Sequence, residues 1–226
     1  MTATTKWGMS GTGLMLELIG PDFPITDGVE LVALCSRDEE RGRRRAAEFG
    51  LSPDIHTDFA EMCARPDIDV IYIGTPHSEH FWQAKASLEA GKHVLVEKAM
   101  TLNAGQAQEL VDLAAQRHLF IMEAMWTRFN PLLRELQRRI ADGVIGDVLQ
   151  VDASFGMYRP FEPEHRLFSA ELGGGTVLDQ GRPVVLIAEP GRELEAATAQ
   201  DRAGPGGARR PSRARLPSGR ASDALH

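Results

Sequence analysis

Several features that would assign the sequence to a specialised class of protein are missing or scarce. Cysteine occurs twice in 226 residues, as Cys35 and Cys63, which is too little for a disulfide framework and lacks the spacing of metal ligands. No apolar run approaches the ~20 residues that cross a membrane. The first residues lack the basic stretch and apolar core of a signal peptide. These absences favour a cytoplasmic protein without a membrane or metal partner.

Positive charge is also in the minority. Lysine and arginine number 25 against 32 aspartates and glutamates, and the formal net charge is −7. A surface of this sign repels the phosphates of nucleic acids. We therefore expect a small molecule, and no nucleic acid, as the partner.

The end of the chain lacks the residues that build a core. Residues 189–226 contain no Phe, Trp, Tyr, Ile, Val or Met and are dominated by Pro, Gly, Ala, Ser and Arg. Such a segment cannot offset an ordering entropy of about 1–2 kcal/mol per residue, so we predict a disordered tail over 188–226. A basic interaction tail is the less favoured alternative, because the arginines lie among Pro and Gly without aromatics.

The first half of the sequence alternates between short apolar runs and helical patterns. The runs predict strands at 6–10, 29–37, 70–73, 93–96 and 119–124. Helices are predicted between them, with Asp38, Asp58, Ser78 and Asn103 as starting residues and Gly50 and Gly91 as stops. This alternation is typical of an α/β fold, a doubly wound parallel sheet of Rossmann type with helices on both faces.

The pattern changes after residue 125. A helix with a basic outer face is predicted over 131–142, followed by a turn over 143–146. Residues 148–155 alternate apolar and polar side chains, which predicts a half-exposed strand. We therefore divide the chain into a Rossmann domain (1–125), an incomplete α+β domain with a mainly antiparallel sheet (126–187) and the tail.

Gly11, Thr12 and Gly13 follow the first predicted strand. Glycines there let backbone N–H groups approach a pyrophosphate, helped by the positive end of the next helix. The third position of the dinucleotide fingerprint holds Leu16 where a small residue is expected. By itself the loop is therefore about as compatible with an ordinary turn as with a cofactor site.

Ser36 and Arg37 end the second predicted strand. NAD-binding proteins usually carry an acidic residue near this point to hold the ribose 2′-hydroxyl, whereas an arginine accommodates a 2′-phosphate. Residues 31–37, which lead up to Asp38, contain no Asp or Glu. This absence favours NADP over NAD as the cofactor. The alternative is a solvated arginine beside a helix cap.

The strands at 70–73 and 93–96 each end in polar residues, and parallel strands bring such ends to one crevice. Lys98 would lie beside a cationic nicotinamide, where like charge and burial disfavour the ammonium and suit the amine to proton transfer. Alternatively, Lys98 is a surface lysine and His80 a solvated residue in the first turn of a helix. The candidate cofactor-binding residues of these ends are Thr75, Pro76, His77, His80, Glu97 and Lys98.

A run of glycines, Gly173 to Gly175, precedes a short apolar stretch that ends in Asp179. This arrangement could place a carboxylate against a ligand. A flexible loop explains the same pattern equally well.

Four segments together resemble the glucose-fructose oxidoreductase / inositol dehydrogenase / MocA family, and within it the dihydrodiol dehydrogenases and NADP-dependent xylose dehydrogenases. They are residues 70–80, 90–98, 122–131 and 173–181, in the family's order and spacing. The resemblance implies hydride transfer between NADP and a CH–OH group of a sugar or cyclic trans-dihydrodiol. It implies that Lys98 handles the proton, that Asp179 serves the substrate site, and that Trp126 and Arg128 border the cofactor pocket.

Two departures from the family pattern leave other hypotheses open. Ala99 stands where the family has proline, and Pro183 stands where it has an aromatic residue or histidine. The remaining sheet-domain motifs are absent, which suggests a truncation or a shifted reading frame. An NADP-binding remnant without turnover and a misfolded product are therefore alternatives to the enzyme. The family often forms homo-oligomers through the second-domain sheet, which is doubtful for this chain.

Overall fold

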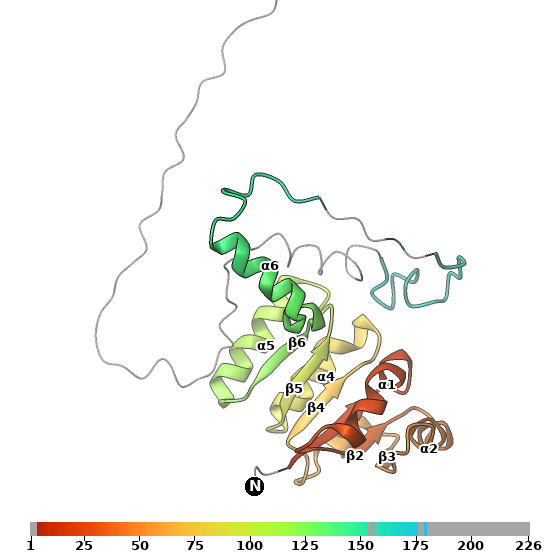
Figure 1. The fold of residues 1–226 in the computed structure, drawn as a ribbon. Coiled ribbons are helices and arrows are strands. Elements are labelled where there is room, and N and C mark those ends of the chain that lie inside the picture. Colours follow the sequence, from red (N-terminus) through yellow and green to blue (C-terminus); the bar gives the residue numbers. More distant parts are fainter. Residues whose placement is uncertain (1–3, 153–155, 157, 176–178, 180–226) are drawn as a thin grey trace, which may run out of the picture.

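A computed structural model describes residues 4–152, 156, 158–175 and 179. Six parallel strands form one sheet in the order β3-β2-β1-β4-β5-β6 (Figure 1). The strands are β1 (Thr5–Ser10), β2 (Val29–Cys35), β3 (Asp54–His56), β4 (Val70–Ile73), β5 (His93–Glu97) and β6 (Ile121–Ala124). This order confirms the predicted Rossmann-type sheet and places a topological switch between β1 and β4.

Helices connect the strands, and two more short elements follow β6. They are α1 (Leu14–Ile19), the 3-10 helix η1 (Gly20–Ile25), α2 (Glu39–Ala47), α3 (Phe59–Cys63), α4 (His77–Glu89), α5 (Ala104–Arg117), the 3-10 helix η2 (Trp126–Phe129) and α6 (Pro131–Ala141). Asp38, Asp58 and Asn103 each accept a backbone N–H at a helix start, as predicted. Gly50 and Gly91 have φ of +69° and +78°, which ends α2 and α4 as expected.

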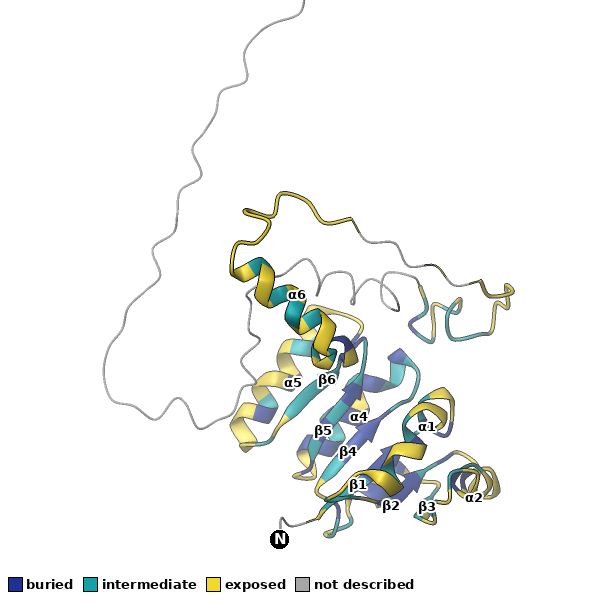
Figure 2. Ribbon diagram, viewed as in Figure 1, coloured by how far each residue is buried: buried dark blue, intermediate teal, exposed yellow. Residues whose placement is uncertain are grey.

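The two faces of the sheet are covered by different helices. Ile71 and Ile73 of β4 pack on one face with residues of α3, α4 and α5, including the fully buried Leu88. Tyr72, which alternates with them, packs on the other face with Leu16 of α1 and residues of α2. Burial is therefore concentrated in the central strands (Figure 2). This packing on both faces fixes the positions of the ends of β1, β4 and β5.

The prediction that Ser78 starts the fourth helix is wrong by two residues. The helix begins at His77, and Pro76 takes the N-cap position with φ −61° and ψ 154°. The proline ring fixes φ at a value that leads directly into a helix, so no hydroxyl cap is needed. The backbone N–H of Ser78 instead lies 3.4 Å from the carbonyl oxygen of Leu172.

The strand predicted over 148–155 is not formed by its described residues, 148–152. Leu149 is 95% exposed, and no neighbouring strand pairs with these residues within the described part of the chain. A lone alternating segment has no partner for its backbone groups, so its sequence pattern is not enough to make a strand. Residues 153–155 and the predicted tail, 188–226, lie outside the described residues.

Within the ranges that the structure describes, no helix is both long and apolar enough to span a bilayer.

Candidate functional site

The turn after β1 approaches the turn after β4 closely. The Gly74 N–H donates to the carbonyl oxygen of Ser10 at 2.9 Å. Gly11 has φ of +106°, and a β-carbon on it would lie 2.8 Å from the carbonyl oxygen of Gly74. Gly13 is different, because a β-carbon there would meet nothing within 4 Å. Gly11 is therefore required by the fold, whereas Gly13 leaves open space above the loop.

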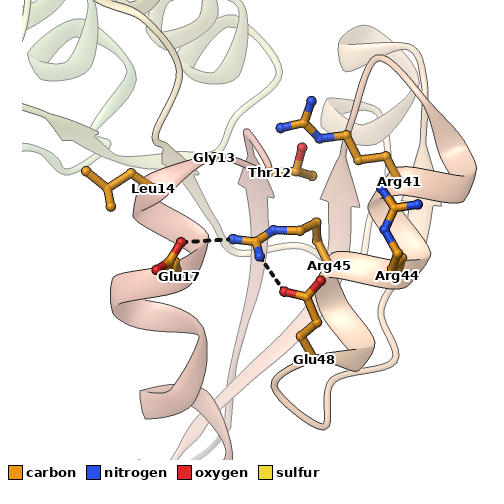
Figure 3. Close-up of a pocket in the computed structure, with 8 residues that line it drawn as sticks. All are labelled: Thr12, Gly13, Leu14, Glu17, Arg41, Arg44, Arg45 and Glu48. Carbon is orange, nitrogen blue, oxygen red and sulfur yellow. Dashed lines mark hydrogen bonds and ion pairs between the residues drawn. The ribbon is translucent and has the colours of Figure 1, made fainter. Parts of the chain in front are cut away.

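A cavity of about 480 Å³ lies between this loop and helix α2 (Figure 3). Figure 3 shows the side chain of Arg41 reaching toward Thr12 and that of Arg45 crossing toward α1. The cavity is lined by Thr12, Gly13, Leu14, Glu17, Arg41, Arg44, Arg45 and Glu48. A hollow bordered by a glycine loop and guanidinium groups suits an anionic ligand.

The arginines of α2 differ in whether they are paired. Arg45 lies 3.3 Å from Glu17 and also pairs with Glu48, and Arg43 pairs with Glu39. Arg41 and Arg44 make no ion pair within the described part of the chain. Their charges are therefore available to a ligand. The sequence analysis missed both, although the predicted helix start at residue 38 places them one helical turn apart on the same side of α2.

Ser36 and Arg37 end β2 as predicted. The Ser36 hydroxyl donates to the carbonyl oxygen of Asp38 at 2.7 Å, and the Asp38 carboxylate accepts the Arg41 N–H at 2.6 Å. The first acidic side chain after β2 is thus engaged in capping α2. Arg37 is exposed and is not part of the cavity lining.

A second cluster centres on the buried carboxylate of Asp179. Its Oδ1 atom accepts the Lys98 Nζ at 3.0 Å and the Arg166 Nη1 at 3.3 Å, and the His77 Nε2 lies 4.0 Å away. Lys98 also donates to the Asp179 carbonyl oxygen. Burial alone would raise the pKa of Asp179, but the hydrogen bonds and charges of Lys98 and Arg166 outweigh it and lower the pKa. The two residues predicted to be catalytic are therefore in direct contact.

His77 and His80 are buried and engage backbone carbonyls. The His77 ring nitrogens lie 2.8 Å from the Gly173 oxygen and 3.1 Å from the Lys98 oxygen. Those of His80 lie 2.8 Å from the Ala99 oxygen and 2.9 Å from the Thr75 oxygen. The alternative of a solvated His80 is excluded by its complete burial. Both rings hold the chain segments that carry Lys98.

Glu97 is the last residue of β5 and directly precedes Lys98. Its carboxylate accepts the Tyr72 hydroxyl at 2.6 Å and the Lys98 N–H at 3.2 Å. Burial raises the pKa of Glu97, because desolvation disfavours the ionised form more than these donors favour it. Glu97 therefore orients the backbone at Lys98 at some cost in stability when it ionises.

This raised pKa makes a testable prediction for Glu97→Gln. A carboxyl whose folded pKa exceeds its unfolded value, about 4.3, favours folding below that value, and this contribution is lost as the pH rises through the folded pKa. As the pH rises from about 4.3 through the folded pKa of Glu97, the free energy of unfolding of the unchanged chain should therefore fall relative to that of the variant. Urea unfolding at several pH values measures the difference, with Glu40→Gln on the exposed face of α2 as the control. A difference that does not change with pH would contradict the assignment.

Trp126 and Arg128 lie on η2, after β6. The Trp126 side chain is 67% exposed, and the Arg128 carbonyl oxygen accepts the Arg134 Nε at 2.9 Å. Neither residue has a side-chain contact with the Asp179 cluster among the interactions found in the described residues. Across the whole described part of the chain, no group of three or more His, Cys, Asp or Glu could hold a metal ion.

The strand order, the switch-point loop and the cavity beside it are those of the Rossmann class of α/β proteins. The chain belongs to the GFO/IDH/MocA family of oxidoreductases. Residues 5–125 match the family model described as "Oxidoreductase family, NAD-binding Rossmann fold", and residues 133–182 match the GFO/IDH/MocA C-terminal domain. The family expected from the four sequence motifs is thereby confirmed.

Individual relatives are informative about the chemistry of the family. A D-xylose 1-dehydrogenase (NADP(+)) from Hypocrea jecorina is 37% identical over 200 residues, which cover 79% of this chain and 50% of the relative. A trans-1,2-dihydrobenzene-1,2-diol dehydrogenase from Xenopus tropicalis is 36% identical over 184 residues, covering 78% and 53%. The chain thus spans about half the length of the curated relatives it matches.

A solved structure is similar over the same part of the chain. It is a 3-ketoreductase from Actinomadura kijaniata in complex with NADP and TDP-benzene, with a TM-score of 0.71 and 29% identity. The match covers 79% of this chain and 54% of that one.

Proposed function

We propose that the chain is an NADP-dependent oxidoreductase that transfers a hydride between the nicotinamide and a CH–OH group of a sugar or cyclic trans-dihydrodiol. The observation that carries this proposal is the contact between Lys98 and the buried carboxylate of Asp179. Oxidation of an alcohol requires a group that accepts the hydroxyl proton, a role that the neutral amine of Lys98 can fill, while the Asp179 carboxylate can accept a hydrogen bond from the substrate. The relatives named for xylose and for a dihydrodiol give the substrate classes.

The residues of the first cavity fit NADP. Gly13 leaves room for a pyrophosphate to approach the backbone, and Arg41 and Arg44 offer unpaired guanidinium groups for the ribose phosphate. The nearest acidic side chain after β2 is occupied by capping. NAD is the less favoured cofactor. The proposed site for the phosphates and the ribose of NADP consists of Gly11, Thr12, Gly13, Ser36 and Arg37. Its proposed nicotinamide end consists of Thr75, Pro76, His77, His80, Glu97, Lys98, Trp126 and Arg128.

In the proposed reaction, Lys98 in its neutral form accepts the proton of the substrate hydroxyl. Asp179 accepts a hydrogen bond from the substrate and orients its carbinol carbon. Oxidised NADP, when bound, would supply the hydride acceptor, so that the carbinol hydrogen would leave with its electron pair as the carbonyl forms. His77 and His80 keep the Lys98 and Thr75 backbone in place.

One comparison tests the proposed function. The purified chain is titrated with NADPH by fluorescence and then assayed with NADP and either xylose or a cyclic trans-dihydrodiol. Binding with turnover supports the enzyme. Binding without turnover supports the second candidate, an NADP-binding module, which is favoured by Pro183 at the position where the family has an aromatic residue or histidine. Absence of folded protein would leave neither function standing.

Arg41 and Arg44 give a sharper test of cofactor choice. Loss of a charge-assisted hydrogen bond costs roughly 1.5–3 kcal/mol, so Arg41→Gln or Arg44→Gln should weaken NADPH binding by about tenfold or more. Binding of NADH, which lacks the ribose 2′-phosphate, should barely change. Arg43→Gln is the matched control, because Arg43 lies on the same helix but pairs with Glu39. Equal losses for both cofactors would show that these arginines do not contact the 2′-phosphate.

The cytoplasm remains the proposed compartment, because both Cys35 and Cys63 are free thiols. We keep the proposed domain limits of 1–125, 126–187 and 188–226. A small-molecule substrate is the proposed partner, and neither nucleic acid nor a membrane is proposed.

A further inference from the structure

Arg166 is a charged residue at the Asp179 cluster that no sequence motif pointed to. It lies in the segment 158–175, where its side chain is 38% exposed, and its guanidinium reaches the same Oδ1 atom that accepts the Lys98 ammonium. The other titratable group that faces this carboxylate from a described element is His77, at the start of α4. Three parts of the chain thus direct cation-forming groups at one carboxylate.

The two cations that share this oxygen are not equivalent. A guanidinium keeps its proton at any ordinary pH, whereas an ammonium can lose one. If Lys98 were the sole cationic partner, its deprotonation would leave a buried carboxylate, 6% exposed in its side chain, without a compensating charge. With Arg166 in place the carboxylate stays paired after the proton has left.

We infer that Arg166 is a positioning residue, which keeps Asp179 ionised and oriented whether Lys98 is charged or neutral. The substrate proton can then move to the Lys98 amine while Asp179 continues to accept a substrate hydrogen bond. The effect on Asp179 rests on geometry alone, and its consequence for turnover rests on the proposed function.

The Asp179 carboxyl itself provides the direct test. In the full chain, its titration midpoint is measured by ¹³C NMR and assigned by comparison with Asp179→Asn. Removal of a nearby cation should raise this midpoint by roughly 0.5–1.5 pH units in Arg166→Gln. Arg166→Met repeats the test with an apolar side chain if the glutamine variant does not fold. Arg166→Lys, which retains the charge, should return the Asp179 midpoint most of the way to its value in the unchanged chain.

Arg159→Gln is the matched control. Arg159 lies in the same segment but contacts His165, at 2.8 Å. Its replacement should leave the Asp179 midpoint unchanged. Equal midpoints in the unchanged chain and in both neutral Arg166 variants would overturn the inference.

Turnover provides a second, separable readout. In Arg166→Gln the acidic limb of the pH–rate profile should move to higher pH, because Asp179 stays protonated to a higher pH once the neighbouring charge is removed. NADPH affinity should stay the same, since Arg166 does not line the α2 cavity. A chain without turnover would count against the proposed enzyme, and the Asp179 titration would still decide the role of Arg166.

Discussion

Replacement of Lys98 by methionine is expected to lower turnover by about 10²–10⁴-fold, the usual contribution of a positioned acid or base. The methionine side chain keeps much of the apolar stem and removes the amine that accepts the proton. NADPH affinity should fall far less than turnover, because Lys98 does not line the cavity beside α2 that we assign to the cofactor phosphates. Steady-state rates with xylose and a dihydrodiol, together with NADPH fluorescence titrations, measure the two effects.

Lys85→Met is the matched control for this experiment. Lys85 is also a lysine held by a carboxylate, that of Glu109, but this pair joins α4 to α5 and the Lys85 side chain is 39% exposed. Its replacement should leave turnover unchanged. Unchanged turnover in Lys98→Met itself would refute the assignment of Lys98 as the proton acceptor.

The second large effect is expected at Gly11. An alanine β-carbon would sit 2.8 Å from the Gly74 carbonyl oxygen, at a φ of +106° that side chains rarely adopt. Strain of this kind costs about 1–3 kcal/mol, so Gly11→Ala should lower the free energy of unfolding by that amount. It should also displace the loop and weaken NADPH binding.

Gly13→Ala separates the two roles of the loop. Its β-carbon would enter open space, so stability should stay within about 0.5 kcal/mol of the unchanged chain. NADPH affinity should nevertheless fall, because the methyl group occupies the space proposed for the pyrophosphate. Urea unfolding and fluorescence titration test the pair of variants. If Gly13→Ala binds NADPH normally, the pyrophosphate does not approach the loop at this glycine.

Regular elements were predictable where local and nonlocal preferences agree. The run at 70–73 became the buried strand β4 with its predicted bounds, because β-branched and aromatic side chains suit a strand packed on both faces. Asn103 capped α5 as predicted. Its side chain accepts the Gln106 N–H at 3.0 Å, whereas the Gln106 side chain accepts the Leu102 N–H at 3.2 Å. Such a choice depends on loop geometry that the sequence does not specify.

Failures occurred where a segment depends on a partner distant in the chain. The alternation at 148–155 is a genuine strand pattern, yet residues 148–152 lack a neighbouring strand in the described chain. The phosphate contact predicted for Arg37 stays a prediction, and the sequence pattern there does not show which arginines of α2 border the glycine loop. Arg41 and Arg44 reach the cavity because the helix starts at a capped residue beside that loop.

The sequence by itself determined the alternation of strands and helices, the glycine loop and the family to which the chain belongs, because these features depend on residues close together along the chain. Tertiary structure decided which groups surround Asp179. Lys98 and Asp179 are 81 positions apart, and Arg166 reaches the same oxygen from a third segment. A carboxylate is held in this way only when packing brings several charges to one buried point, and that arrangement is a property of the folded chain.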